Sequence, residues 1–173
     1  MSQESEIRIT EAILGAKGYD FEKTDEPSRF TGEFDDVQWE GNGVLFWSPK
    51  RSAPGALFHE LGHLLGGTPQ EIASTNWSPD GMRHTECEDR AVETQAVLYY
   101  LFRRYFDWEW VANALEYVAL DDIKKFRSFK DLIAGSWAEP DRVVRQFKSL
   151  EEHLPYLLGD RFDIATTHRQ GRR

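Results

Sequence analysis

Two histidines and a glutamate stand together in the run His59-Glu60-Leu61-Gly62-His63. The histidines are four residues apart, so on a helix their imidazole rings project from the same face. In this H-E-x-x-H spacing, two histidines bind a metal ion and the intervening glutamate polarises a metal-bound water. We therefore expect a metal site with His59 and His63 as ligands and Glu60 as a catalytic residue.

The sequence on either side of the motif predicts a helix that is apolar on nearly every side. Ser52 can cap its start, Pro54 suits its first turn, and Gly66-Gly67 can end it. Unpaired buried polar groups cost about 1–3 kcal/mol each, so such a helix needs partners for its histidines and its glutamate. A metal ion would satisfy all three. The apolar positions are Ala56, Leu57, Phe58, Leu61, Leu64 and Leu65.

A catalytic zinc ion usually has three protein ligands and one open position, so two histidines leave the site incomplete. The third ligand is expected from a long helix predicted over residues 86–106. Acidic residues cluster at the start of this helix, and Thr85 with Glu88 three residues later forms a capping-box pattern. The capping box gives Glu88 an alternative, purely structural role.

Helical spacing selects between two carboxylates of this helix, Glu88 and Glu93. A ligand that faces the motif helix should share its face with small or apolar residues three and four positions later. Glu88 is followed at this spacing by Ala91 and Val92, and Glu93 likewise by an alanine and a valine. Glu88 is the preferred third ligand and Glu93 is the alternative.

The length of 173 residues suits one domain with a substantial core, which we place at residues 1–164. Residues 165–173 are polar and basic and are expected to form a disordered tail. The chain has 21 basic and 30 acidic residues, a formal charge of -9. This balance argues against a general nucleic-acid binder, whose footprint is normally basic.

The sequence favours a soluble cytoplasmic protein. Residues 1–6 are polar and acidic, unlike a secretory signal, and no apolar stretch approaches the roughly 20 residues that span a bilayer. The single cysteine, Cys87, excludes an intramolecular disulfide and fits a reducing compartment. No feature indicates the oligomeric state.

The pattern predicts an α+β fold that is mostly α, with the motif helix packed on the long helix beside a small β-hairpin. Asn42-Gly43 between two apolar runs is typical of a hairpin turn. A strand just ahead of the motif helix is either a docking edge for an extended peptide or a plain cover of the core. Residues 19–36 show no periodicity. Further helices are predicted at residues 5–18, 107–120, 123–134 and 141–154.

The run Phe58-His59-Glu60-Leu61-Gly62-His63-Leu64-Leu65-Gly66 resembles the short gluzincin-type metallopeptidases, which include the ImmA/IrrE-like proteins. The resemblance covers about residues 59–102. Members of that group carry a further helix with Glu-Ala and Phe-Ala pairs, of which this chain matches only Glu88, Ala91 and Val92. The resemblance implies a minimal zincin-like fold, a zinc ion and a protein or peptide substrate.

A second resemblance, to the elongation factor P hydroxylases, extends over most of the middle of the chain. In that family the same two histidines and a carboxylate are taken to hold redox-active iron, so the resemblance implies an oxygen-dependent enzyme. The matching residues are Val44-Leu45-Phe46, Trp77, Pro79-Asp80-Gly81, Glu88-Asp89, Val92 and Gln95-Ala96.

Three functional interpretations follow. In a zinc peptidase, Glu60 would take a proton from water and give it to the leaving amine, while Tyr99 and His84 are candidates to stabilise the oxyanion, with Tyr100 and Arg83 as alternatives. In a hydroxylase, the histidines and one carboxylate would form a facial triad on iron. In a non-catalytic interaction protein, the metal would be structural, with Cys87 as an added ligand. These residue types suit both zinc and iron.

Overall fold

A computed structural model describes residues 1–24, 37–40, 44–48, 53–66, 81–117, 123, 125–135, 137 and 139–164. Helices dominate this part of the chain, and the expected α+β, mostly α class is confirmed. The helices are α1 (Ser2–Ala16), α2 (Ala56–Gly66), α4 (Gly81–Leu101), the short 3-10 helix η2 (Arg103–Tyr105), α5 (Trp108–Tyr117), α6 (Phe129–Ala134) and α7 (Pro140–Leu158). The strands are β1 (Asp20–Lys23), β2 (Val37–Glu40) and β3 (Val44–Trp47).

The three strands form one small mixed sheet in the order β1-β3-β2. β2 and β3 are antiparallel, as the hairpin prediction requires, although the predicted turn at Asn42-Gly43 lies outside the described residues. β1 is parallel to β3 and was not expected. Four residues with a single apolar side chain, Phe21, are too short a pattern to show periodicity. Phe21 stacks on Trp47 of β3, which explains how tertiary contact fixes this strand.

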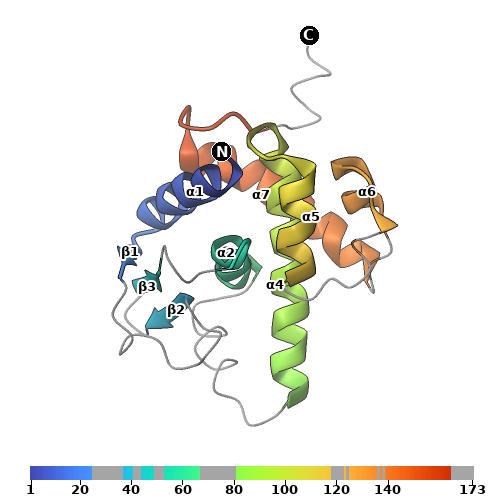
Figure 1. Cartoon of the computed structure of the whole chain (residues 1–173), viewed down its shortest axis with the longest axis horizontal. Helices are drawn as coiled ribbons and strands as arrows, with labels where there is room; N and C mark the ends of the chain where they lie inside the picture. Colours follow the sequence, from blue (N-terminus) through green and yellow to red (C-terminus); the bar gives the residue numbers. More distant parts are fainter. Residues whose placement is uncertain are drawn as a thin grey trace.

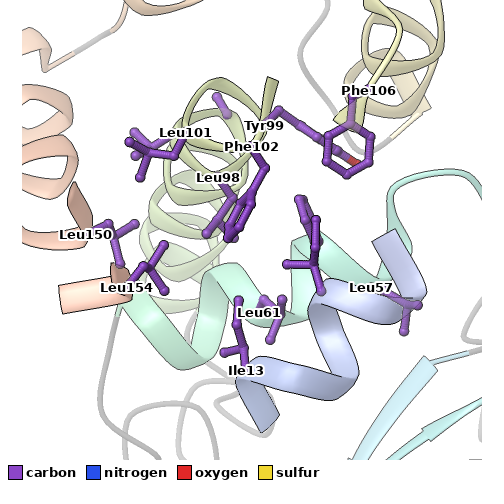
Figure 2. Packing of buried hydrophobic residues seen from close by; sticks show 14 of the residues in the cluster. Ile13, Leu57, Leu61, Leu98, Tyr99, Leu101, Phe102, Phe106, Leu150 and Leu154 are labelled. Atoms are coloured by element: carbon purple, nitrogen blue, oxygen red, sulfur yellow. The ribbon is translucent and has the colours of Figure 1, made fainter. Parts of the chain in front are cut away.

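The motif helix α2 lies at the centre of the molecule. Figure 1 shows it nearly end-on, between α1, the sheet and the long helix α4. Its apolar side chains enter a common core with those of neighbouring helices, where Ile13 of α1, Leu61 of α2, Leu98 of α4 and Leu154 of α7 converge (Figure 2). The same enclosure makes an unpaired polar group on α2 costly in free energy.

α2 and α4 approach each other so closely at Gly62 that a side chain there would overlap the backbone of Ala91. Ala91 is fully buried. A small residue such as Ala91 allows two helices to approach this closely. The contact point lies between the two histidines on α2 and one turn after Glu88 on α4.

Gly62→Ala is expected to lower the free energy of unfolding by about 1–3 kcal/mol, because the added methyl group must push two helix backbones apart. Gly15→Ala in α1 is the matched control, since a Cβ there meets nothing within 4 Å. Urea unfolding of both variants measures the difference. Equal stability of the two variants would contradict the close approach.

The long helix begins earlier than predicted, at Gly81. Thr85 and Glu88 therefore lie inside α4, and the interpretation of these residues as a capping box is wrong. No glycine or proline follows Gly81 before Glu88, so nothing in this stretch stops the helix from extending toward its amino terminus. The carboxylate of Glu88 is consequently not occupied in capping.

Other boundaries differ by a turn or more. The motif helix starts at Ala56, after a turn at Pro54-Gly55, in which Gly55 has φ +85. The helix predicted from residue 123 is regular only from Phe129, because Ser128 caps it by accepting a hydrogen bond from the Asp131 amide. The long helix gives way to η2 after Leu101. The predicted disordered tail, 165–173, lies outside the described residues.

Candidate metal centre

Helix α2 brings the two histidines of the motif side by side. The ring centroids of His59 and His63 are 4.9 Å apart, and the rings are nearly perpendicular, at 85°. Ligand atoms of His59, Glu60 and His63 all lie within 4.8 Å of one another. The side chain of His63 is 3% exposed and that of His59 is 12% exposed. These positions follow from helical spacing alone.

Glu88 of α4 completes the cluster. Its Oε2 lies 2.7 Å from Nε2 of His59, and its Oε1 lies 3.1 Å from Nε2 of His63. The close approach at Gly62 makes this contact possible, because Glu88 stands one turn before Ala91 on the face that meets α2. The side chain of Glu88 is 34% exposed, so the cluster reaches the surface on the side of α4.

The surroundings keep Glu88 ionised. Burial opposes the charge, but hydrogen bonds and charge interactions with His59 and His63 outweigh it and hold the pKa of this carboxyl well below its usual range. An anionic carboxylate that faces two imidazoles is the form in which it would bind a cation.

Glu93, the alternative third ligand, has a different partner. Its Oε2 lies 2.7 Å from Nε of Arg142 in α7, and its Oε1 lies 2.8 Å from Nη2 of the same guanidinium. Five residues correspond to about 140° around a helix, so Glu88 and Glu93 leave α4 on different faces. The structure brings Glu88 to the histidines and ties both oxygens of Glu93 to Arg142.

Of the four candidate oxyanion groups, the structure describes the side chains of Tyr99 and Tyr100, and both have partners away from the histidines. Tyr99 is fully buried and donates a hydrogen bond of 2.8 Å to Oε1 of Glu6, while its ring packs on Phe58. Tyr100 packs against Arg103, whose guanidinium carbon lies 4.3 Å from the ring centroid. His84, Arg83 and Cys87 belong to α4, but their side chains lie outside the described residues, as does Trp77.

Sequence reasoning missed Glu6, a buried carboxyl of α1 that contacts the start of α2. Its amide partner is Phe58, the residue before His59. A signal was present, because Glu6 shares helical spacing with the buried residues Ile9, Thr10 and Ile13. An acidic residue on such a face indicates a polar partner in the interior.

The donor set fits a divalent transition metal, since imidazole nitrogens with a carboxylate oxygen suit zinc and iron alike. No described helix is both long enough and apolar enough to cross a bilayer. No protein-family model, curated protein or solved structure matches the chain. The functional assignment therefore depends on the side chains of the cluster.

Proposed function

We propose that this chain is a mononuclear metal-dependent hydrolase, a zinc peptidase acting on a protein or peptide substrate in the cytoplasm. His59, His63 and Glu88 would hold the metal, and Glu60 would be the catalytic base. One observation carries the proposal: Glu88 contacts both histidines, with Glu60 beside them. In hydrolysis the three ligands leave a coordination position for water, and Glu60 lies within reach as its base.

Each residue has a role that follows from its chemistry. The metal, when bound, supplies Lewis acidity and lowers the pKa of water. Glu60 takes the proton from the attacking water and passes it to the leaving amine. Glu88 contributes negative charge, and its partly exposed side chain lies where a substrate can approach. His59 and His63, being mostly buried, hold the site in the interior.

The position of β2 supports an extended peptide as the substrate. β2 lies at the edge of the sheet, and among the described strands it pairs with β3 alone. It also contacts α2, which carries the histidines. An extended peptide added to this edge would run beside the cluster.

The identity of the third ligand, Glu88, favours a second candidate, a non-haem iron hydroxylase. Glu88-Asp89 is a pair that resembles the elongation factor P hydroxylases, and Glu88 is the carboxylate found at the histidines. Two histidines and one carboxylate can leave open positions on iron, which then supplies oxygen activation. Glu60 would serve in proton transfer.

Metal analysis separates the two candidates. The protein is purified without added metal, and its zinc and iron contents are measured with its visible spectrum under nitrogen and under oxygen. We expect one zinc per chain and an oxygen-independent spectrum. Iron with oxygen-dependent absorption would replace hydrolysis by hydroxylation. A folded chain that carries no metal and does not take up zinc would refute both.

Glu60→Gln is expected to lower the rate of peptide hydrolysis at least about a hundredfold while leaving the metal content unchanged, because its role is proton transfer rather than ligation. Glu109→Gln, which removes an exposed carboxylate from α5, is the control and should keep full activity. Casein or a quenched fluorescent peptide library serves as substrate. Unchanged turnover in Glu60→Gln would remove this residue from the mechanism.

A further inference from the structure

Glu6 is a buried acidic residue of α1 that the proposed mechanism does not use. It is 3% exposed. Its Oε1 accepts a hydrogen bond of 3.1 Å from the amide of Phe58 and one of 2.8 Å from the hydroxyl of Tyr99. The amide of Gly55 also interacts with this carboxyl. Three donors from two other segments thus converge on one side chain of α1.

These bonds join α1, the first turn of α2 and the middle of α4. Phe58 is the third residue of α2 and directly precedes His59, and Tyr99 belongs to α4. Gln95, one turn before Tyr99, donates a further hydrogen bond of 3.0 Å to the carbonyl of Gly55. The start of α2 is therefore held against α4 by side chains, through Glu6 on one path and Gln95 on the other.

The electrostatics suit an acidic group at this point. The first amides of a helix lack partners within it and attract negative charge. Burial raises the pKa of Glu6 to about 7, and the bonds from Tyr99, Phe58 and Gly55 act against that rise. Burying an acidic side chain costs free energy unless it is hydrogen-bonded. An apolar side chain at this position could not accept the hydrogen bonds from Phe58 and Tyr99.

Two contacts fix α2 relative to α4. The first is the backbone approach of Gly62 to Ala91, which sets how far apart the helices lie. A single close contact still allows α2 to pivot about it. The second contact, at the first turn of α2, combines the bonds of Glu6 with that of Gln95 to Gly55, four to seven residues before Gly62, and restricts this pivoting.

We propose that Glu6 is a positioning residue of the metal centre, which holds the first turn of α2 against α4 so that His59 and His63 face Glu88. This inference rests on the proposed metal site. Supporting groups that orient metal ligands typically change affinity by 10–100-fold when removed, although they touch no metal. Glu6 contacts no ligand directly and acts through α2, the helix that carries two of the ligands.

The test uses cobalt(II) alone as the probe, because its visible spectrum reports coordination geometry. The full-length chain is stripped of metal, and cobalt affinity and spectrum are measured for wild type, Glu6→Leu, Glu6→Gln and Tyr99→Phe. Glutamine keeps an acceptor oxygen without the charge. Far-ultraviolet circular dichroism verifies folding of each variant.

Two controls separate positioning from general effects. Glu4→Gln removes an exposed carboxylate from the same helix. Leu132→Ala truncates a fully buried side chain of α6 and so destabilises the fold at another place. Both controls should keep the wild-type cobalt affinity and spectrum.

We expect Glu6→Leu to weaken cobalt binding by at least about tenfold and to alter the spectrum, with Glu6→Gln within about threefold of wild type. Tyr99→Phe, which removes one of the three donors to Glu6, should fall between them. Wild-type affinity and spectrum in both Glu6→Leu and Tyr99→Phe would overturn the positioning role alone, as would an equal loss in Leu132→Ala or in Glu6→Gln. A wild-type chain that binds no cobalt would overturn the metal centre itself, and the positioning role with it.

Discussion

Glu88→Ala is expected to weaken zinc binding by roughly a hundred- to a thousandfold, whereas Glu93→Ala should leave zinc affinity within about threefold of wild type. Zinc sites with four ligands bind with about 10–16 kcal/mol, or roughly 2.5–4 kcal/mol per ligand, and each 1.4 kcal/mol is tenfold. Glu88 faces both histidines, while Glu93 is bonded to Arg142. Competition with a chromophoric chelator measures both affinities.

The same pair of variants should show the reverse order in stability. Glu93→Ala leaves the guanidinium of Arg142, which is 17% exposed, without its bidentate partner and only with Glu139 at 3.3 Å. We expect a loss of about 3–4 kcal/mol in the free energy of unfolding, at the lower end of the range for a broken buried pair because Arg142 is partly exposed. Metal-free Glu88→Ala should lose less. Equal zinc affinities in the two variants would show that neither carboxylate is the third ligand.

The stability of the chain should fall as the pH rises from about 5 to about 8, by about 3 kcal/mol more in wild type than in Glu6→Gln. Burial raises the pKa of Glu6 from 4.5 to about 7, with bonds from Tyr99, Phe58 and Gly55 opposing the rise. Between these two values the folded chain keeps a proton that the unfolded chain has released. Folding therefore becomes less favourable with increasing pH, by 1.36 kcal/mol per unit of pKa difference.

The comparison with Glu6→Gln isolates this one group. Glu88, whose pKa is lowered, acts in the opposite sense and loses its contribution only as the pH falls toward acid values. The contribution of Glu88 to the pH dependence is the same in wild type and in Glu6→Gln, so it cancels when the two are compared. Urea unfolding of both chains in chelator-containing buffers at pH 5, 6, 7 and 8 gives the result. Parallel curves over this range would contradict a raised pKa at Glu6.

The sequence predicts best where the chemistry depends on local spacing. His59 and His63 meet because they are one turn apart on a helix that forms as expected. The residues that follow Glu88 and Glu93 left both open as the third ligand, with Glu88 preferred, and the structure places Glu88 at the histidines through the contact of Gly62 with Ala91. That it binds a metal stays a prediction.

The features that sequence reasoning missed depend on distant parts of the chain. β1 exists as a strand because β3 offers it a partner, and its own residues carry no periodic signal. Glu6 is a buried acceptor because α1 happens to cross the first turn of α2. The capping interpretation of Glu88 failed for a related reason, since a cap assigned from a short pattern ignores whether the helix can continue past it.

The anchoring of α4 by α7 has a consequence for how an ion would enter and leave. Arg142 holds α4 at Glu93, beyond the turn that carries Glu88. Releasing the turn at Glu88 from α2 would break the contacts of Glu88 with the histidines and of Ala91 with Gly62, while Arg142 kept the rest of the helix docked, and such a local opening costs far less than global unfolding. Exchange of the cation with the surrounding solution would then require only this part of the helix to loosen, and the empty and loaded forms would share one core.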